Sequence, residues 1–211
     1  EFGRYPHTYR VKRAIAGTPL VSIIVPFRDK PDLLETCVRS VLEKTAYSHY
    51  ELLCVDNGSV ERETHALLEA LQELDSRVRV IVYDKPFNYS AINNFAVQHA
   101  AGEHLLFLNN DTEVVAPQWL EAMLEHSQRP DVGVVGAQLM YDDGTLQHAG
   151  VIAGLGGVAG RRVAQPAMSP GTHANERQEL GRERGLASTP ELFEPSHEDL
   201  TCLPWSGRGR P

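Results

Sequence analysis

Long apolar runs, an excess of basic residues and closely spaced cysteines are all missing from this sequence of 211 residues. No apolar run reaches the roughly 18 residues that a membrane-spanning helix needs, so none is expected in this chain. The formal net charge is -8, which argues against a nucleic-acid partner, because such proteins carry basic patches. The three cysteines are too far apart for a disulfide scaffold or a CxxC zinc site. With no charged-then-apolar leader in residues 1–20, these absences predict a cytoplasmic protein.

Strand-forming residues are scarce at the end of the chain. Residues 161–211 hold 6 of the 13 prolines, seven Arg and no Lys, but one Val and no Ile. No helical or strand periodicity is sustained there. We therefore predict three parts: an N-terminal extension or linker at 1–20, an ordered part at 21–160, and an atypical, poorly ordered tail at 161–211 with at most a short helix around 175–184. One hypothesis is that the tail is an out-of-frame continuation of a longer gene, which the other two reading frames of the DNA would test.

Residues 21–160 alternate apolar strands with amphipathic helices. The apolar run at 21–25 (VSIIV) is typical of a strand buried on both faces. Helical spacing of apolar residues follows Pro31, and Ser90 is the expected cap of a later helix. The expected strands are 21–25, 51–55, 78–83, 104–108 and 132–139, and the expected helices are 31–42, 67–74, 90–101 and 117–127. This alternation predicts an α/β fold with a mostly parallel sheet and helices on both faces.

Polar residues cluster where these strands end. Arg28 follows the first strand, Asp56 and Asn57 follow the second, and Asp111 follows the fourth. Ligands of open α/β sheets bind at the carboxyl ends of the strands. The loop after the first strand, PFRDKPD, contains neither GxGxxG nor GxxxxGK[ST], so a Rossmann dinucleotide site and a P-loop are not supported.

Each cluster has two interpretations. Asp56 can accept hydrogen bonds from a ribose hydroxyl or a base N–H, but Asp-Asn-Gly-Ser is also strong turn chemistry. The oxygens of Asn109, Asn110 and Asp111 suit Mg²⁺ or Mn²⁺, although this segment too can be a simple turn. A cation there could bridge a diphosphate and assist its departure.

Four stretches, in this order, resemble glycosyltransferase family 2, whose members have the GT-A fold. They are VSIIVPFRDKPDLLETCVRSVLEKT, YELLCVDNGSVERET, FNYSAINNFAVQHAAGEHLLFLNNDTEV and VGVVGAQLMYDDGTLQHAG, and they cover residues 20–160. The resemblance implies a nucleotide-sugar-binding GT-A half with an incomplete acceptor half. The third stretch is most similar to the bacterial surface-polysaccharide branch, which includes rhamnosyltransferase-like enzymes.

The resemblance also implies roles for residues of the nucleotide site. Pro26 and Arg28 would lie beside the nucleotide base. Asp56, with Asn57 next to it, matches the acidic residue that contacts base or ribose. Asn94 matches an Asn on the helix before the metal strand.

The metal motif of the family matches Asn109-Asn110-Asp111. Asp111 corresponds to the last residue of the DxD-like motif, which holds Mg²⁺ or Mn²⁺ on the diphosphate. Asn109 stands where many relatives have Asp, so the site has one charge fewer.

Two further assignments stay open. His148 is either a surface loop residue or a contact to the acceptor or the diphosphate. The catalytic base is unassigned, because family relatives place it beyond the equivalent of Gly160. Glu198-Asp199 is the one acidic pair there that could be imagined in that role, and a solvated pair is the alternative.

The function that follows is an inverting glycosyltransferase of hexosyltransferase type. It would transfer a sugar from a nucleotide-diphosphate sugar to a saccharide or lipid-linked acceptor in cell-surface polysaccharide synthesis, in the cytoplasm or at the inner face of the plasma membrane. The alternatives are a non-catalytic nucleotide-sugar-binding fragment, a sugar nucleotidyltransferase, and an interaction protein whose polar strand ends are only turns. The glycine-free PFRDKPD loop counts against the nucleotidyltransferase.

Overall fold

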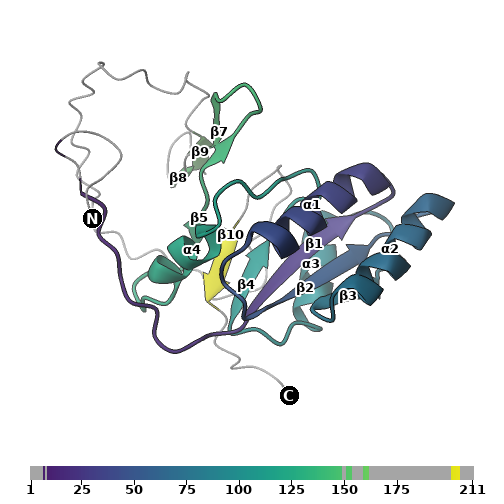
Figure 1. Cartoon of the computed structure of the whole chain (residues 1–211), viewed down its shortest axis with the longest axis horizontal. Coiled ribbons are helices and arrows are strands. Elements are labelled where there is room, and N and C mark those ends of the chain that lie inside the picture. The colour runs from purple at the N-terminus through teal and green to yellow at the C-terminus, as the bar shows by residue number, and fades with distance from the viewer. Residues whose placement is uncertain (1–6, 8, 149–150, 154–158, 162–200, 205–211) are drawn as a thin grey trace.

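A six-stranded sheet forms the centre of the protein, in the order β3-β2-β1-β4-β10-β5 (Figure 1). The computed structural model describes residues 7, 9–148, 151–153, 159–161 and 201–204. The first four strands in the chain are mutually parallel, and β10 is antiparallel to both of its neighbours. The strands of this sheet are β1 (Val21–Phe27), β2 (Tyr50–Asp56), β3 (Val78–Val82), β4 (His104–Phe107), β5 (Val135–Gly136) and β10 (Thr201–Pro204).

Helices cover both faces of this sheet. α1 (Pro31–Lys44), α2 (Arg62–Leu74) and α4 (Trp119–Ser127) pack on one face, and α3 (Tyr89–Val97) packs on the other (Figure 1). Successive side chains of a strand point to opposite faces, so Ile23 of β1 joins the first cluster and Ile24 joins the second. The predicted α/β architecture, with its mostly parallel sheet, is confirmed.

Helix α1 shows why the sequence pattern succeeded. Pro31 occupies its first turn, where the missing N–H costs nothing. Leu34, Cys37, Val38 and Val41 then recur at helical spacing and are fully buried against the sheet. The turn that leads into α1 places Asp29 and Lys30 in the left-handed region, with φ of 53° and 58°.

Several expected boundaries were wrong, among them the start of α2, which is Arg62 rather than 67. The cap of α3 is Asn88, not Ser90, because the extended backbone of Asn88 lets its side chain accept the N–H of Ala91 at 2.9 Å. α3 ends at Val97 rather than at 101, and α4 begins at Trp119 rather than at 117. The expected strand at 132–139 is instead β5 and a separate β6 (Leu139–Met140), which pairs with β7 (Leu146–His148).

The compositionally unusual tail contributes a strand to the main sheet. β10 lies between β4 and β5, with Cys202 opposite Leu106 on one side and Val135 on the other. A second pair joins β8 (Val151–Ala153) to β9 (Ala159–Arg161). The sequence did not predict β10, because its pairing comes from the backbone of its neighbours and not from β-branched side chains. The expected helix at 175–184 lies outside the described residues.

Residues 9–19 run against α4. The guanidinium of Arg10 pairs with Glu125, and the backbone N–H of Arg13 donates to the same carboxylate at 3.3 Å. Gln128 accepts the N–H of Ala16 at 2.9 Å and donates to the carbonyl of Ala14 at 2.8 Å. The predicted N-terminal extension is therefore fastened to the helical layer. Among the residues that the structure describes, no helix has the length and apolar character to cross a bilayer.

A buried polar network joins the strands at their amino ends. Glu51 accepts hydrogen bonds from Ser22 Oγ, Arg79 and the N–H of Ala101, each at 2.6 Å. Burial opposes the charge of Glu51, but these bonds outweigh it and lower its pKa. Ser22 Oγ in turn accepts the N–H of Gly102 at 2.8 Å. The network ties β1, β2 and β3 together at the end opposite to the polar loops.

Candidate functional site

The polar strand ends predicted from the sequence meet at one edge of the sheet. β1 pairs in parallel with β2 on one side and with β4 on the other. Asp56 ends β2, and Asp111 follows β4 by a few residues, so the two carboxylates come from strands that flank β1. Two strand spacings put β2 and β4 about 10 Å apart. The end of β1 is therefore surrounded by the loop that follows it, the loop that follows β2 and the loop that carries the metal motif.

Asp29 fastens the first of these loops to the second. Its backbone N–H donates to Ser59 Oγ at 2.8 Å, and its Oδ1 accepts the N–H groups of Val60 and Glu61 at 2.8 and 2.9 Å. The bond from Glu61 lowers the pKa of Asp29, with a further contribution from Val60. Arg28, directly before it, is exposed at the tip of the loop. Asp29 thus fixes the backbone from which Arg28 projects.

Asp56 is 4% exposed at the end of β2. Its Oδ1 accepts the N–H of Ser59 at 2.8 Å, which is the turn that Asp-Asn-Gly-Ser favours. Among the described residues, no hydrogen bond is made to its Oδ2. Half of the carboxylate therefore builds the turn and half is left to contact a ligand, so the two interpretations of Asp56 are compatible.

Asn57 links the second loop to the segment after β3. Its Nδ2 donates to the carbonyls of Tyr83 and Lys85 at 3.0 and 2.8 Å, while its own N–H donates to the carbonyl of Phe27 at 2.9 Å. Its Oδ1 is buried and accepts no hydrogen bond from the described residues. A buried acceptor without a donor costs roughly 1–3 kcal/mol, and this oxygen is closed off from solvent in the structure.

The two neighbouring asparagines of α3, Asn93 and Asn94, differ in their exposure to solvent. Asn94, which the sequence singled out, is exposed. Asn93 is buried, donates to the carbonyl of Tyr89 at 3.0 Å, and has an Oδ1 with no donor among the described residues. Sequence reasoning missed Asn93, although Ile92 and Ala96 mark the buried face of this helix and Asn93 adjoins it.

The loop that carries the metal motif follows β4. Asn109 and Asn110 are half-buried and Asp111 is exposed. The carbonyl of Asn109 accepts hydrogen bonds from Thr112 Oγ1 at 2.7 Å and from Cys37 Sγ at 3.5 Å. The motif therefore lies against α1 and presents its one carboxylate outward.

Comparison with known proteins identifies the family. The model of glycosyl transferase family 2 matches residues 22–173. The chain belongs to this family. The match extends beyond the expected boundary at Gly160 and into the compositionally unusual tail.

Two of its relatives are named for the biosynthesis of O-antigen and of teichuronic acid. The O-antigen biosynthesis protein RfbC of Myxococcus xanthus is 55% identical over 155 residues, which cover 74% of this chain and 12% of that protein. The uncharacterized protein y4gI of Sinorhizobium fredii is 49% identical, over 82% of this chain and 19% of that protein. The putative teichuronic acid biosynthesis glycosyltransferase TuaG of Bacillus subtilis is 31% identical, over 60% of this chain and 50% of that protein. The chain thus spans half or less of the length of these relatives.

A solved structure confirms the GT-A fold. It is the mannosyltransferase PcManGT from Pyrobaculum calidifontis, in complex with GDP-Man and Mn²⁺. The TM-score is 0.56 at 20% sequence identity, and the match covers 64% of this chain and 40% of that one. At this identity the likeness concerns the fold alone.

The oxygen ligands of the metal motif fit a cation that is also bound by the diphosphate of a nucleotide. No group of three or more His, Cys, Asp or Glu side chains is clustered anywhere in the described part of the chain. Asp111 and the amides of Asn109 and Asn110 offer only oxygen ligands of the kind that Mg²⁺ and Mn²⁺ take. Mg²⁺ commonly uses one or two carboxylates together with substrate phosphates. The motif is therefore sufficient for a cation held jointly with a diphosphate.

His148 does not lie on an exposed loop. It is 4% exposed, belongs to β7, and is opposite Leu139 of β6 in the small two-stranded sheet. The interpretation as a surface loop residue was wrong, because His148 is a buried residue of a strand. Its contact with an acceptor or diphosphate stays a prediction. Glu198-Asp199 lies outside the described residues, and the catalytic base stays unassigned.

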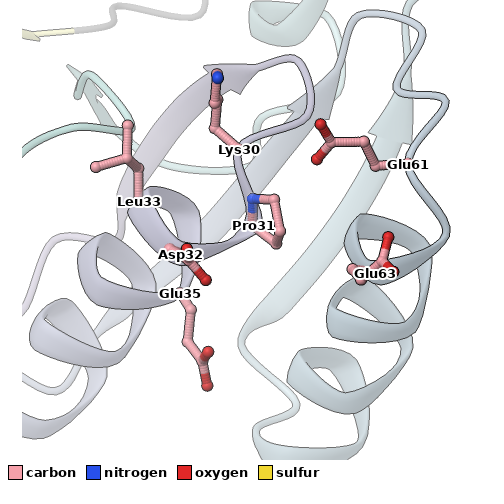
Figure 2. Close-up of a pocket in the computed structure, with 7 residues that line it drawn as sticks. All are labelled: Lys30, Pro31, Asp32, Leu33, Glu35, Glu61 and Glu63. Atoms are coloured by element: carbon pink, nitrogen blue, oxygen red, sulfur yellow. The ribbon is translucent and has the colours of Figure 1, made fainter.

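A cavity of about 670 Å³ lies next to the loops that follow β1 and β2, between the N-terminal ends of α1 and α2. Figure 2 shows its lining side chains on these two helix ends and on the loops that precede them. Four carboxylates line it against one amine, which disfavours a diphosphate. None of the residues predicted for the nucleotide site lines this cavity, so we do not assign the donor to it. The lining residues are Lys30, Pro31, Asp32, Leu33, Glu35, Glu61 and Glu63.

Proposed function

We propose that this chain is the donor-binding half of an inverting, metal-dependent glycosyltransferase that uses a nucleotide-diphosphate sugar. The observation that carries the proposal is the placement of Asp56 and Asp111 at the ends of the two strands that flank β1. One carboxylate is then available to a nucleoside and the other to a cation on its diphosphate. Membership of glycosyl transferase family 2 supports this division of roles.

The nucleoside would bind at the ends of β1 and β2. Oδ2 of Asp56 would accept a hydrogen bond from a ribose hydroxyl or a base N–H, since Oδ1 is engaged by Ser59. Pro26, half-buried in β1, and the exposed Arg28 would lie beside the base. Asn57 adjoins Asp56 in the same turn, and Asn94, exposed on α3, is the position suggested by family resemblance.

Asp111 would hold Mg²⁺ or Mn²⁺, with Asn109 and Asn110 beside it. When bound, the cation would supply positive charge to the departing diphosphate. The mannosyltransferase with the same fold is complexed with Mn²⁺ and GDP-Man, which supports a divalent cation and a nucleotide sugar here as well. The carboxylate of Asp111 is exposed and needs no rearrangement of the core to reach such a ligand.

The acceptor would be a saccharide or a lipid-linked saccharide of a cell-surface polysaccharide. The relatives named for O-antigen and teichuronic acid biosynthesis support this class. The reaction would take place in the cytoplasm or at the inner face of the membrane, where nucleotide sugars and lipid-linked acceptors meet. A base that deprotonates the acceptor hydroxyl completes an inverting transfer, and we assign that role to none of the described residues.

Thermal unfolding with UDP, GDP and dTDP, each with Mn²⁺ or with EDTA, tests the proposal. A ligand that binds only the native state raises stability by about 2.7 kcal/mol at 100 times its dissociation constant. We expect one nucleotide to give a Mn²⁺-dependent shift that disappears in Asp111→Ala. Asp142→Ala, which removes another exposed aspartate in a turn, should keep the shift. A cooperatively unfolding protein that responds to no nucleotide would contradict the proposal, and binding without sugar transfer would favour the non-catalytic alternative.

A further inference from the structure

One face of α1 follows the metal-motif loop along three successive turns. Cys37, Ser40 and Lys44 are spaced by three and four residues, which places them in a row on a helix. Lys44 forms an ion pair with Glu113 of the loop. The side chains at the other two positions contact the backbone of the loop, on both sides of Asp111.

Ser40 holds the backbone after Asp111. Its Oγ accepts the N–H of Val114 at 3.0 Å and donates to the carbonyl of Cys37 at 2.8 Å. The side chain is buried, with 4% of Ser40 exposed. Because its donor and acceptor capacities are both used, the hydroxyl has one defined orientation, and the loop is fixed three residues after the carboxylate.

Cys37 holds the backbone before Asp111. Its Sγ donates to the carbonyl of Asn109 at 3.5 Å and lies 3.8 Å from Thr112 Oγ1, which donates to the same carbonyl. The loop is therefore also fixed two residues before the carboxylate.

We infer that Cys37 and Ser40 are positioning residues, which hold the loop so that Asp111 can share a divalent cation with a diphosphate. This inference rests on the proposed function. The motif has a single carboxylate on an exposed side chain, so its alignment depends on the backbone on either side. Both backbone anchors come from α1, whose own position is fixed by the core. Without them, the loop would have to be ordered when the ligand binds, which weakens binding.

The test compares two buried serines that each accept a backbone N–H. Ser40→Ala removes the anchor at Val114, and Ser22→Ala removes the matching acceptor of Gly102 at the opposite end of the sheet. The dissociation constants of UDP, GDP and dTDP would be measured by calorimetry, each with Mn²⁺ and with EDTA. We expect Ser40→Ala to weaken Mn²⁺-supported binding about tenfold, the usual effect of losing a group that orients a metal ligand. Binding in EDTA should not change, and Ser22→Ala should alter neither constant.

Cys37 supplies a second pair of variants in case Ser40→Ala does not fold. Cys37→Ser keeps a donor at this position and should retain the Mn²⁺ effect, whereas Cys37→Ala should lose part of it. Amide hydrogen exchange of a peptide spanning residues 109–117 gives a readout without any ligand, and exchange should quicken in Ser40→Ala and Cys37→Ala only.

The outcomes separate the two proposals. Equal loss of binding in Mn²⁺ and in EDTA would indicate a general structural role and overturn the positioning inference. Unchanged Mn²⁺-supported binding in both Ser40→Ala and Cys37→Ala would overturn it as well. A native protein that binds no nucleotide would instead overturn the proposed function, whatever the variants do.

Discussion

Oδ1 of Asp29 accepts the backbone N–H of Glu61 at 2.9 Å, across two loops that are some thirty residues apart in the chain. The aspartate adopts a left-handed backbone, with φ of 53°, which Asp tolerates better than most residues. This one contact fixes the loop after β1 to the start of α2. It explains how a glycine-free loop, PFRDKPD, can keep a defined shape beside a candidate nucleotide site.

Asp29→Asn should weaken nucleotide binding several-fold and reduce the acid sensitivity of the fold. The pKa of Asp29 is lowered from its ordinary value of 3.8 by the backbone N–H of Glu61, with burial acting in the opposite sense. The carboxylate therefore contributes stability above that ordinary value and loses its contribution as the pH falls through the lowered one. Urea unfolding between about pH 5 and pH 2.5 should show a shallower decline in Asp29→Asn. An equally shallow decline in the exposed control Asp142→Asn would contradict this assignment.

Gly102→Ala should destabilise the protein. A Cβ at this position would lie 2.5 Å from the backbone nitrogen of Ser22 and 2.8 Å from the carbonyl of Leu20, and neither atom can move aside without shifting β1. The cost should be about 1–3 kcal/mol or more, as for other overpacked interiors. Gly133→Ala is the matched control, because no atom lies within 4 Å of its added Cβ. Similar unfolding midpoints for the two variants would refute the predicted clash.

Gly58→Ala should destabilise the turn that follows β2. Gly58 has φ of 76° and lies between Asp56 and Ser59, whose hydrogen bond closes this turn. A left-handed backbone costs an alanine about 1–2 kcal/mol. Gly58→Asn should cost less, since Asn adopts this conformation more readily. Denaturant unfolding of the two variants checks this order. An equal loss of stability in both would contradict the role of backbone conformation, because no atom lies within 4 Å of an added Cβ.

Asn109→Asp should strengthen the binding of Mn²⁺ in the presence of a nucleoside diphosphate. The change adds a second carboxylate to a motif that has only Asp111, and cation sites of this kind are tuned by the number of charged ligands. Titration of free Mn²⁺ by electron paramagnetic resonance, at fixed GDP or UDP, measures the effect. Gln138→Glu adds the same charge at an exposed position elsewhere and should change little. No gain in Asn109→Asp would indicate that this side chain does not face the cation.

The parts of the fold that could be predicted are those whose signal is local. The apolar run at 21–25 must be buried on both faces, and the spacing from Leu34 to Val41 fits only a helix, so β1 and α1 were predicted close to their observed bounds. The cap of α3 was misplaced because Ser90 and Asn88 are both good caps, and the backbone conformation decides between them. β10 could not be predicted, since its partners lie far away in the sequence.

In the candidate site, too, the features with a local signal could be predicted and those that depend on distant partners could not. Asp56 ends one apolar strand and Asp111 follows another by a few residues, and parallel pairing then brings strand ends to one edge whatever the loops do. The strand that carries His148 pairs with β6, which has no local signal, and the burial of Asn93 depends on the phase of α3 against the sheet. The anchoring of the metal-motif loop by Cys37 and Ser40 requires α1 and β4 to be adjacent, which the sequence does not state.

The position of β10 has a consequence for the order in which the chain assembles. During synthesis the N-terminal half emerges first, and β1 to β4 can pair as soon as His104–Phe107 has left the ribosome. β4 then presents an open edge until Thr201–Pro204 is made, and β5 reaches the sheet only through that late strand. Exposed edges recruit other strands, so the nascent chain passes through a period in which it is prone to mispairing. Late closure of this edge makes β10, the last strand among the described residues, the one that joins β5 to β4.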